Sequence, residues 1–305
     1  MSEDGLKKIG ILVGSEKEWP EAFITAVNEK DANATAEFVK LGGTQMAEEV
    51  PYDVIIDRAS QDIPYYRAYA KYAVIQGVYV INNPFIWSAD SKFFGAALIR
   101  ELGMNSPRTI VLPNKEINQE VSVDSFRNLI YPMDWEGIVD YVGVPAIFKD
   151  IHSGGRPAVH RVNNIDELIQ RFDESDTRTM LLQQIITSDI HIHAFVIGQE
   201  DVVLLRFSRP DDHYLPQAIG PDDPRHEELT QAALALSRAY KYDVNMVEFV
   251  IDDADKVYVI NSTNPTPVID RTLMNAEQFD LIVDKMATMA IERAHNPQPM
   301  DSLLT

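Results

Sequence analysis

Oxygen-bearing side chains lie along two strand-like runs, residues 246–253 and 256–265, that an acidic turn joins. Glu248 alternates with apolar neighbours in the first run, so it faces the opposite side of the strand from them. The turn sends the chain back, which places Asn261 close to Glu248 and Thr263 just beyond. A carboxylate beside an amide oxygen suits a hard cation such as Mg²⁺. The alternative is an ordinary hairpin whose polar ends are solvated.

Two lysines could hold phosphate groups. Lys149 ends an apolar strand and precedes a loop that contains Gly154, Gly155 and Arg156. The glycines allow main-chain N–H groups to approach phosphate oxygens, although the order of residues is not that of a Walker A loop. Lys92 lies on the first turn of an expected helix, where a cation is unfavourable for the helix. The position becomes favourable if a bound anion contacts both Lys92 and the free N–H groups of that turn. A common Ser-Gly-Gly turn and a solvated surface lysine are the alternatives.

An apolar strand over residues 180–186 carries two adjacent amides, Gln183 and Gln184, which must face opposite sides. One of them should reach an interior or cleft, where it needs hydrogen-bond partners, and adenine offers both donors and acceptors. His191 and His193 share one face of the next strand. No third ligand follows them at a spacing typical of zinc sites, so we do not expect zinc there.

Composition excludes several classes of function. The chain has 305 residues, is 45% hydrophobic and 24% charged, and contains no cysteine, so no disulfide, thiolate nucleophile or Cys-based zinc site can form. A formal net charge of −20 argues against nucleic-acid or membrane partners. An anionic small molecule is compatible if basic residues gather, as Arg206 and Arg209 do beside a Phe-Ser pair. No signal peptide or membrane-spanning run is expected, which predicts a cytoplasmic protein.

The first part of the chain alternates short apolar strands with helical patterns, which predicts a small α/β lobe with a parallel sheet. The expected strands are 9–13, 54–56 and 78–81, and the expected helices are 19–27 and 65–75. Such lobes bind ligands beyond the carboxyl ends of their strands. Arg58 and the pair Asn82 and Asn83 follow two of those ends.

Strands and helices also alternate in the rest of the chain. A helix from Ser88 to Leu102 is expected to be capped by Ser88 or Asp90, and one from Asn164 to Phe172 by a capping box of Asn164 and Glu167. A partly helical stretch is expected over 126–133 and 136–142, and helices at 226–240 and 275–295. An extended segment is expected at 107–112, and strands at 144–149, 180–186, 192–197 and 202–207.

In this order the motifs resemble the ATP-grasp superfamily, and within it the ribosomal-protein glutamate ligase-like and D-alanine–D-alanine ligase-like amide ligases. The residues that carry the resemblance are Asp90-Ser91-Lys92, Lys149 with Gly154-Gly155, Leu182 to Ile186, Ile192 to Gly198 followed by Arg206, Glu248, and Asn261. The resemblance implies an α/β fold in three lobes. These are a pre-ATP-grasp lobe over 1–85, a linker and central lobe over 86–186, and a C-terminal lobe with the metal ligands over 187–305.

The resemblance also implies the role of each site residue. ATP would be bound by Lys92, Lys149, Gly154, Gly155, Gln183, Gln184, Ile186 and Asp189, and Mg²⁺ by Glu248 and Asn261. Arg206 and Arg271 would be catalytic, with Arg206 at the acylphosphate oxygens, and Arg58, Arg209 and Thr263 would bind substrate. Arg58 and Arg271 are the candidates for a substrate carboxylate.

This chain departs from the family pattern at three places. Gln184 stands where a glutamate is usual, and His193 where an arginine is usual. The usual metal run Glu-x-Asn becomes Asn261-Ser262-Thr263, so one carboxylate is lost, and Asn264, Asp243 or Asp270 could compensate. Lost charge weakens the attraction for Mg²⁺ and bears on catalysis more than on fold.

The resemblance implies an ATP-dependent enzyme that joins a small-molecule carboxylate to an amine through an acylphosphate. A small-molecule kinase of the same fold and a catalytically weakened nucleotide-binding module are the alternatives. We expect no nucleic-acid or membrane partner, and the sequence leaves a homodimer open.

Overall fold

The first four strands of the computed structural model form a parallel sheet in the order β2-β1-β3-β4. The structure describes residues 5–86, 91–116, 128–130, 132–152, 159–298 and 300. The strands of this sheet are β1 (Lys7–Leu12), β2 (Ala34–Phe38), β3 (Val54–Asp57) and β4 (Tyr79–Ile81), and its helices are α1 (Glu18–Glu29) and α2 (Pro64–Ile75).

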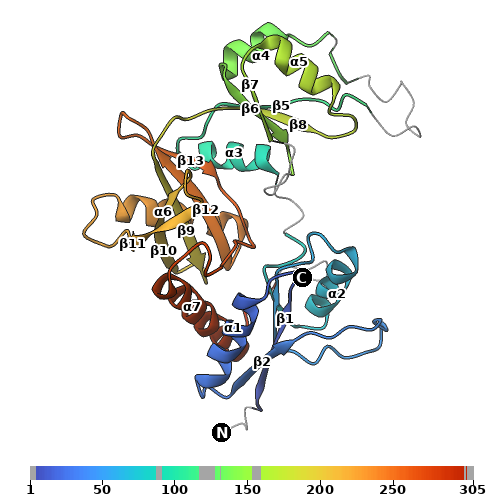
Figure 1. The fold of residues 1–305 in the computed structure, drawn as a ribbon. Helices are drawn as coiled ribbons and strands as arrows, with labels where there is room; N and C mark the ends of the chain where they lie inside the picture. The colour runs from blue at the N-terminus through green and yellow to red at the C-terminus, as the bar shows by residue number, and fades with distance from the viewer. Residues whose placement is uncertain are drawn as a thin grey trace. The chain divides into compact units, whose positions relative to one another are not determined.

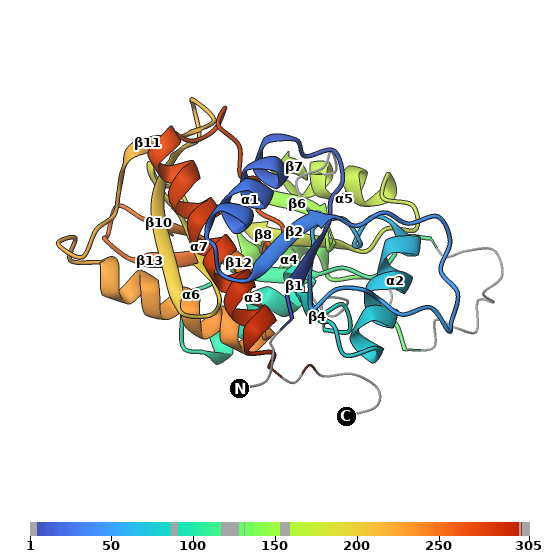
Figure 2. The same ribbon diagram turned by 90° about the horizontal axis from the view of Figure 1, so that it is seen from below.

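Both faces of this sheet are covered, which explains its near-continuous apolar strands. Val54 and Ile56 pack in one apolar cluster with α1, whereas Ile55 packs in another with α2. The C-terminal helix α7 (Ala276–His295) lies beside α1 in the first of these clusters (Figure 2). Residues 275–295 therefore complete a core that begins at residue 9.

A second sheet has the order β11-β10-β9-β12-β13. β10 pairs antiparallel with both β9 and β11. Its strands are β9 (Ile190–Ile197), β10 (Asp201–Ser208), β11 (His213–Ala218), β12 (Val244–Ile251) and β13 (Val257–Asn261), and α6 (His226–Tyr240) connects β11 to β12.

A third sheet is antiparallel and has the order β5-β8-β6-β7. Helices α4 and α5 lie together over it in Figure 1 and share its apolar core, which includes Phe148, Val162 and Leu168. The elements are α3 (Lys92–Glu101), β5 (Thr109–Val111), α4 (Trp135–Val142), β6 (Ala146–Asp150), β7 (Val159–Val162), α5 (Ile165–Asp173) and β8 (Met180–Gln184).

The chain divides into two compact units, and neither is continuous in sequence. Unit 1 contains Met1–Ala89, His191–Glu248 and Thr263–Thr305, and unit 2 contains Asp90–Ile190 and Phe249–Ser262. Strand β12 crosses the division after Glu248. Among the described helices, none has the length and apolar character needed to cross a membrane.

The mixed α/β class with a parallel N-terminal lobe is confirmed, and most predicted elements are present. Strands β2, β7 and β11 were not predicted. β2 and β7 are short and mix apolar with polar residues. Most of β11 is exposed, and this strand contains Pro216, so none of the three has a long apolar pattern. The predicted helix at 126–133 is wrong where it is described, because residues 128–130, 132 and 133 are not helical.

The helix caps differ in detail from the predictions. Helix α3 begins at Lys92 and is capped by Ser91, whose side chain accepts from the Phe94 N–H, while Ser88 and Asp90 lie outside the described residues. Asn164 caps α5 as predicted. The Glu167 carboxylate, however, accepts from the Asn163 N–H at 2.9 Å rather than closing the box on Asn164.

Candidate functional site

Lys149, at the end of β6, is held by a side chain of the neighbouring strand. Its Nζ donates to Gln183 Oε1 at 2.9 Å, and Gln183 Nε2 donates to Thr109 Oγ1 at 3.0 Å. Gln183 is buried, so one of the two adjacent amides reaches the interior with hydrogen-bond partners, as predicted. An amide oxygen holds the ammonium group in place without cancelling its charge.

Lys92 makes a similar contact. Its Nζ donates to Asn261 Oδ1 at 2.8 Å, across 169 positions of sequence. The backbone places the two together, because Asn105, just after α3, binds β13 on both sides of Tyr258. Asn105 O accepts from the Val259 N–H, and Asn105 Nδ2 donates to Val257 O, both at 2.9 Å. Unit 2 thus contains the predicted phosphate-binding lysines, each on an amide oxygen.

Three further residues predicted to bind the nucleotide, Gln184, Ile186 and Asp189, lie at or just after the end of β8. Gln184 Oε1 accepts from the Arg108 N–H at 3.3 Å, and Gln184 N donates to Arg108 O at 2.9 Å. Ile186 is half-buried and Asp189 is exposed. Gly154 and Gly155 lie outside the described residues, so their role stays a prediction.

His193 lies in an aromatic cluster of unit 1 beside the predicted metal ligand Glu248. Its ring stacks on Phe207 at 4.7 Å between centroids, and its Nδ1 is 2.9 Å from the Tyr214 hydroxyl. Burial lowers the pKa of His193, and the nearby Glu248 carboxylate opposes this shift without reversing it. Burial and then Glu248 raise the pKa of Tyr214. His193 therefore favours its neutral imidazole and Tyr214 its neutral phenol beside the Glu248 carboxylate.

The lowered pKa of His193 predicts a pH dependence of stability. Its neutral form is favoured in the fold, so its contribution to the free energy of unfolding is present above about pH 6.5 and is lost as the pH falls below that value. We expect the His193→Gln variant, which cannot titrate, to lose less stability than the wild type between pH 7 and about pH 5. Urea unfolding at several pH values measures this, and parallel curves would contradict it.

Glu248 and Asn261 lie on β12 and β13, neighbouring strands of one sheet. Glu248 is half-buried and belongs to unit 1, whereas Asn261 belongs to unit 2. Their shared role as metal ligands therefore stays a prediction. Among the described residues, no three His, Asp or Glu side chains gather into a group that could hold a metal ion. Oxygen donors of this kind fit Mg²⁺, which needs few protein ligands when phosphates complete its shell.

Arg206 lines a cavity of about 500 Å³ beside β11. Its Nη2 is 3.3 Å from Asp223 Oδ2, and its side chain is 45% exposed, so it is accessible to an anion. The cavity also includes residues 215–220. Sequence reasoning missed Tyr214 because β11 was not predicted, and it missed Asp223, which lies in the segment after β11.

The other predicted arginines are placed differently. Arg209 is exposed just beyond β10. Arg271 pairs with Asp280 at 2.7 Å and lies over the Phe279 ring at 4.1 Å from its centroid. These contacts orient Arg271 along α7, and its catalytic role stays a prediction.

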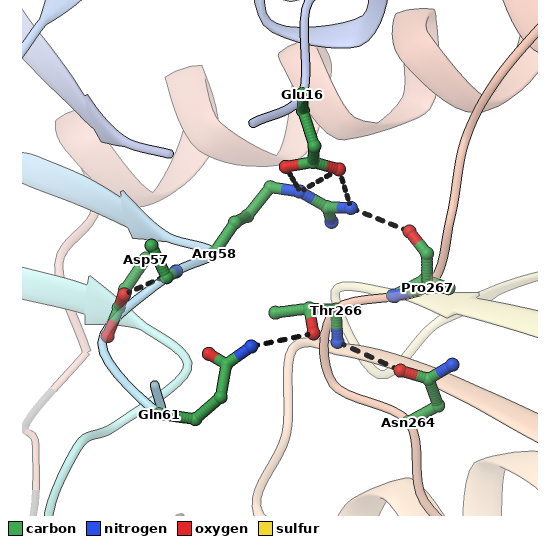
Figure 3. A network of polar contacts seen from close by, with 8 residues as sticks. Glu16, Asp57, Arg58, Gln61, Asn264, Thr266 and Pro267 are labelled. Carbon is green, nitrogen blue, oxygen red and sulfur yellow. Dashed lines mark hydrogen bonds and ion pairs between the residues drawn. The ribbon is translucent and has the colours of Figure 1, made fainter. Parts of the chain in front are cut away.

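Arg58, predicted to bind substrate, is buried in a polar network of unit 1 that Figure 3 shows. Its Nη2 donates to Glu16 Oε1 and to Pro267 O, both at 2.6 Å, and its Nε donates to Glu16 Oε2 at 2.8 Å. Its guanidinium also lies 4.5 Å from the Trp19 ring centroid. Arg58 therefore anchors the segment around residue 267 to the first sheet.

The segment that follows β13 is fixed by further contacts. Gln61 Nε2 donates to Thr266 Oγ1 at 3.4 Å, and Thr266 N donates to Asn264 Oδ1 at 3.3 Å (Figure 3). Asn82, at the end of β4, exchanges two hydrogen bonds with the backbone of Val244, at 2.7 and 3.0 Å. Thr263 is buried at the start of the segment.

The described fold is similar to solved structures although the sequence identity is low. A RimK-domain ATP-grasp protein from Sphaerobacter thermophilus matches with a TM-score of 0.65 and 17% identity, over 93% of this chain and 99% of that chain. A peptide-modifying ATP-grasp ligase from Chryseobacterium gregarium, in complex with ADP and a leader and core peptide, matches with a TM-score of 0.65 and 15% identity, over 97% and 99%.

A D-alanine–D-alanine ligase from Bacillus anthracis, complexed with ATP, matches with a TM-score of 0.61 and 15% identity, over 95% of this chain and 97% of that chain. No protein-family model and no curated protein matches the sequence. The chain has the ATP-grasp fold, and the resemblance in the order of its motifs is confirmed at the level of fold.

Proposed function

We propose that the protein is an ATP- and Mg²⁺-dependent ligase that joins a carboxylate to an amine. The observation that carries the proposal is the placement of Lys92 and Lys149 in unit 2, each held by an amide oxygen, within a fold that matches ATP-grasp ligases along nearly its whole length. Two oriented ammonium groups suit the phosphates of a nucleotide. The similar ligases contain ATP or ADP in their solved structures.

The chemistry would proceed by positioning and charge neutralisation. A substrate carboxylate attacks the γ-phosphate of ATP and releases ADP, and the amine then displaces phosphate from the acylphosphate. The two lysines and Arg206 would offset the charge that develops on the transferred phosphoryl group. Glu248 and Asn261 would hold Mg²⁺, which supplies charge neutralisation at the phosphates.

The contact between Lys92 and Asn261 bears directly on metal binding. The Asn261 oxygen that would ligate Mg²⁺ accepts a hydrogen bond from a cation of the chain itself. Nucleotide phosphates would attract Lys92 and free this oxygen for the metal ion. We therefore propose that Mg²⁺ and the nucleotide bind together, each improving the affinity for the other.

Nucleotide binding is tested by removing one lysine. We expect MgATP to raise the melting temperature of the wild-type protein, and Lys149→Ala to weaken ATP affinity at least about tenfold, because an oriented charge at the phosphates is lost. Lys115→Ala is the matched control, since Lys115 is a partly exposed lysine of the same unit that pairs with Asp173. The absence of any MgATP-dependent shift in the wild type would refute nucleotide binding.

The reaction class is tested by product analysis. ADP release that requires both a carboxylate and an amine supports a ligase, and phosphate found on a hydroxyl group supports a kinase instead. Because one similar ligase is seen with a leader and core peptide, the panel should contain free amino acids, dipeptides and longer acidic peptides. Tight MgATP binding without turnover on any substrate favours a nucleotide-binding module, the alternative that Asn261 in place of a carboxylate suggests.

A further inference from the structure

Unit 1 contains a second cavity that the proposed reaction does not use. Its volume is about 400 Å³, and it is formed where β4, the turn between β9 and β10, the end of α6 and the end of α7 meet. Cavities of this size accommodate small organic ligands. Tyr79 lines it from the first sheet, Arg238 from α6, Lys241 from the residue after α6, and Arg293 from α7.

The charges of this cavity differ from those of the chain as a whole. Carboxylates outnumber basic residues 47 to 27 in the sequence, yet the lining has three cationic side chains against two carboxylates, Glu200 and Asp243. Asp243 is already paired. Its Oδ1 accepts from Arg293 at 3.1 Å, and its Oδ2 accepts from the Tyr79 hydroxyl at 2.5 Å.

The three cationic residues have complementary roles. Arg293 is 8% exposed, and its Nε makes no hydrogen bond to the described residues, so a buried guanidinium at the wall keeps donor capacity. Arg238 and Lys241 are exposed, so a ligand can reach them from solvent. Lys241 is the C-cap residue of α6. Its backbone is left-handed, with a φ of 54°, and this turn keeps the residue beside the last turn of the helix.

This cavity is separate from the candidate site. Asp243 lies just before the first residue of β12, five residues from Glu248, which corresponds to roughly 16 Å along an extended strand. The turn at Gly198 to Glu200 likewise lies at the end of β9 away from His191. A ligand in this cavity would not occupy the place of the Glu248 carboxylate.

We propose that this cavity is a second binding site, for a small carboxylate-bearing metabolite. Arg238 and Lys241 would contact the carboxylate oxygens, with Arg293 fixed behind them by Asp243. The apolar side chains of Ile86 and Met300 also line the cavity and would contact a carbon skeleton, which inorganic phosphate lacks. The site lies between secondary-structure elements of all three sequence segments of unit 1, so a bound ligand would stabilise their packing.

The test uses the full chain without nucleotide or Mg²⁺, so that it is independent of the proposed ligase activity. Citrate, succinate and L-glutamate are titrated by calorimetry and in thermal melts, against sodium chloride of matched ionic strength, with inorganic phosphate as a separate arm. At least one carboxylate should bind and raise the melting temperature above the chloride control. The Arg238→Gln/Lys241→Gln variant should weaken this binding at least tenfold, and Lys241→Gln alone should weaken it measurably.

The control removes two positive charges from the same unit outside the cavity. Lys30→Gln/Lys285→Gln alters two ion pairs, with Asp284 and Asp201 respectively, and should bind the carboxylate as the wild type does. Arg206→Gln should also retain binding, since Arg206 lines the other cavity. The proposal is overturned if none of the three carboxylates binds, if the cavity variants bind as tightly as the wild type, or if phosphate binds more tightly than every carboxylate.

Discussion

Glu248→Gln is expected to lower ATP-dependent turnover on the order of 100-fold or more, about 2.7 kcal/mol of transition-state stabilisation. The substitution keeps the shape of the side chain and removes a full charge from the proposed metal site, to which Asn261 would supply only a neutral amide. Carboxylates bind Mg²⁺ far better than amides do. The free energy of unfolding without ligand should change little. Glu248 is only half-buried, so water still reaches the side chain at this position in the variant.

Initial rates at several Mg²⁺ concentrations measure this effect. Glu228→Gln is the matched control, because Glu228 is an exposed carboxylate of α6 in the same unit. The Glu248→Gln variant should require a higher Mg²⁺ concentration than the wild type to reach any given rate. Unchanged turnover and unchanged Mg²⁺ dependence would mean that Glu248 is no metal ligand and that β12 and β13 form only a structural hairpin.

The second large effect concerns the buried ion pair of unit 1. Arg293→Met is expected to destabilise the protein by about 3–5 kcal/mol, because it leaves the Asp243 carboxylate buried without its cation. Asp243 is only 4% exposed, and the Arg293 guanidinium also donates to Gly198 O at 3.1 Å. Tyr79 still donates to Asp243 in the variant, but one neutral hydrogen bond does not replace a charge partner.

Two further variants separate this effect from general damage to α7. Lys285→Met removes an exposed cation of the same helix, paired with Asp201 at 2.7 Å, and should cost less than about 1 kcal/mol. Adding Asp243→Asn to Arg293→Met should restore part of the lost stability, because no unpaired charge is then buried. Chemical unfolding of the four proteins measures this. A loss for Arg293→Met no larger than that for Lys285→Met would show that the pair is energetically unimportant.

Local patterns predicted those elements whose apolar residues repeat with a clear period. Helices α1, α2, α6 and α7 were predicted because each buries an apolar stripe, and strands β1, β3, β9 and β10 because each contains a buried apolar run. Strands β2, β7 and β11 take their stability from the strand beside them, and their own residues do not show it. Pairing of this kind is a tertiary property.

The candidate residues could be found from sequence, but their contacts could not. Lys92 and Asn261 were both chosen, yet nothing local indicates that they touch, since a whole sheet of unit 2 lies between them in sequence. Arg58 follows a buried strand and so looks like a residue that binds ligand. Its partners Glu16 and Pro267 lie 42 and 209 positions away, and only the fold brings them together.

The packing of α7 has a consequence for the order in which the protein is made. Helix α7 packs on α1 and on β1, which precede it in the sequence and are therefore synthesised earlier. The apolar cluster that contains Phe23 on α1 and Phe279 on α7 cannot close until α7 has been synthesised. Until then, the apolar face of the N-terminal lobe that α7 will cover stays exposed. Such exposure favours aggregation and chaperone binding during translation.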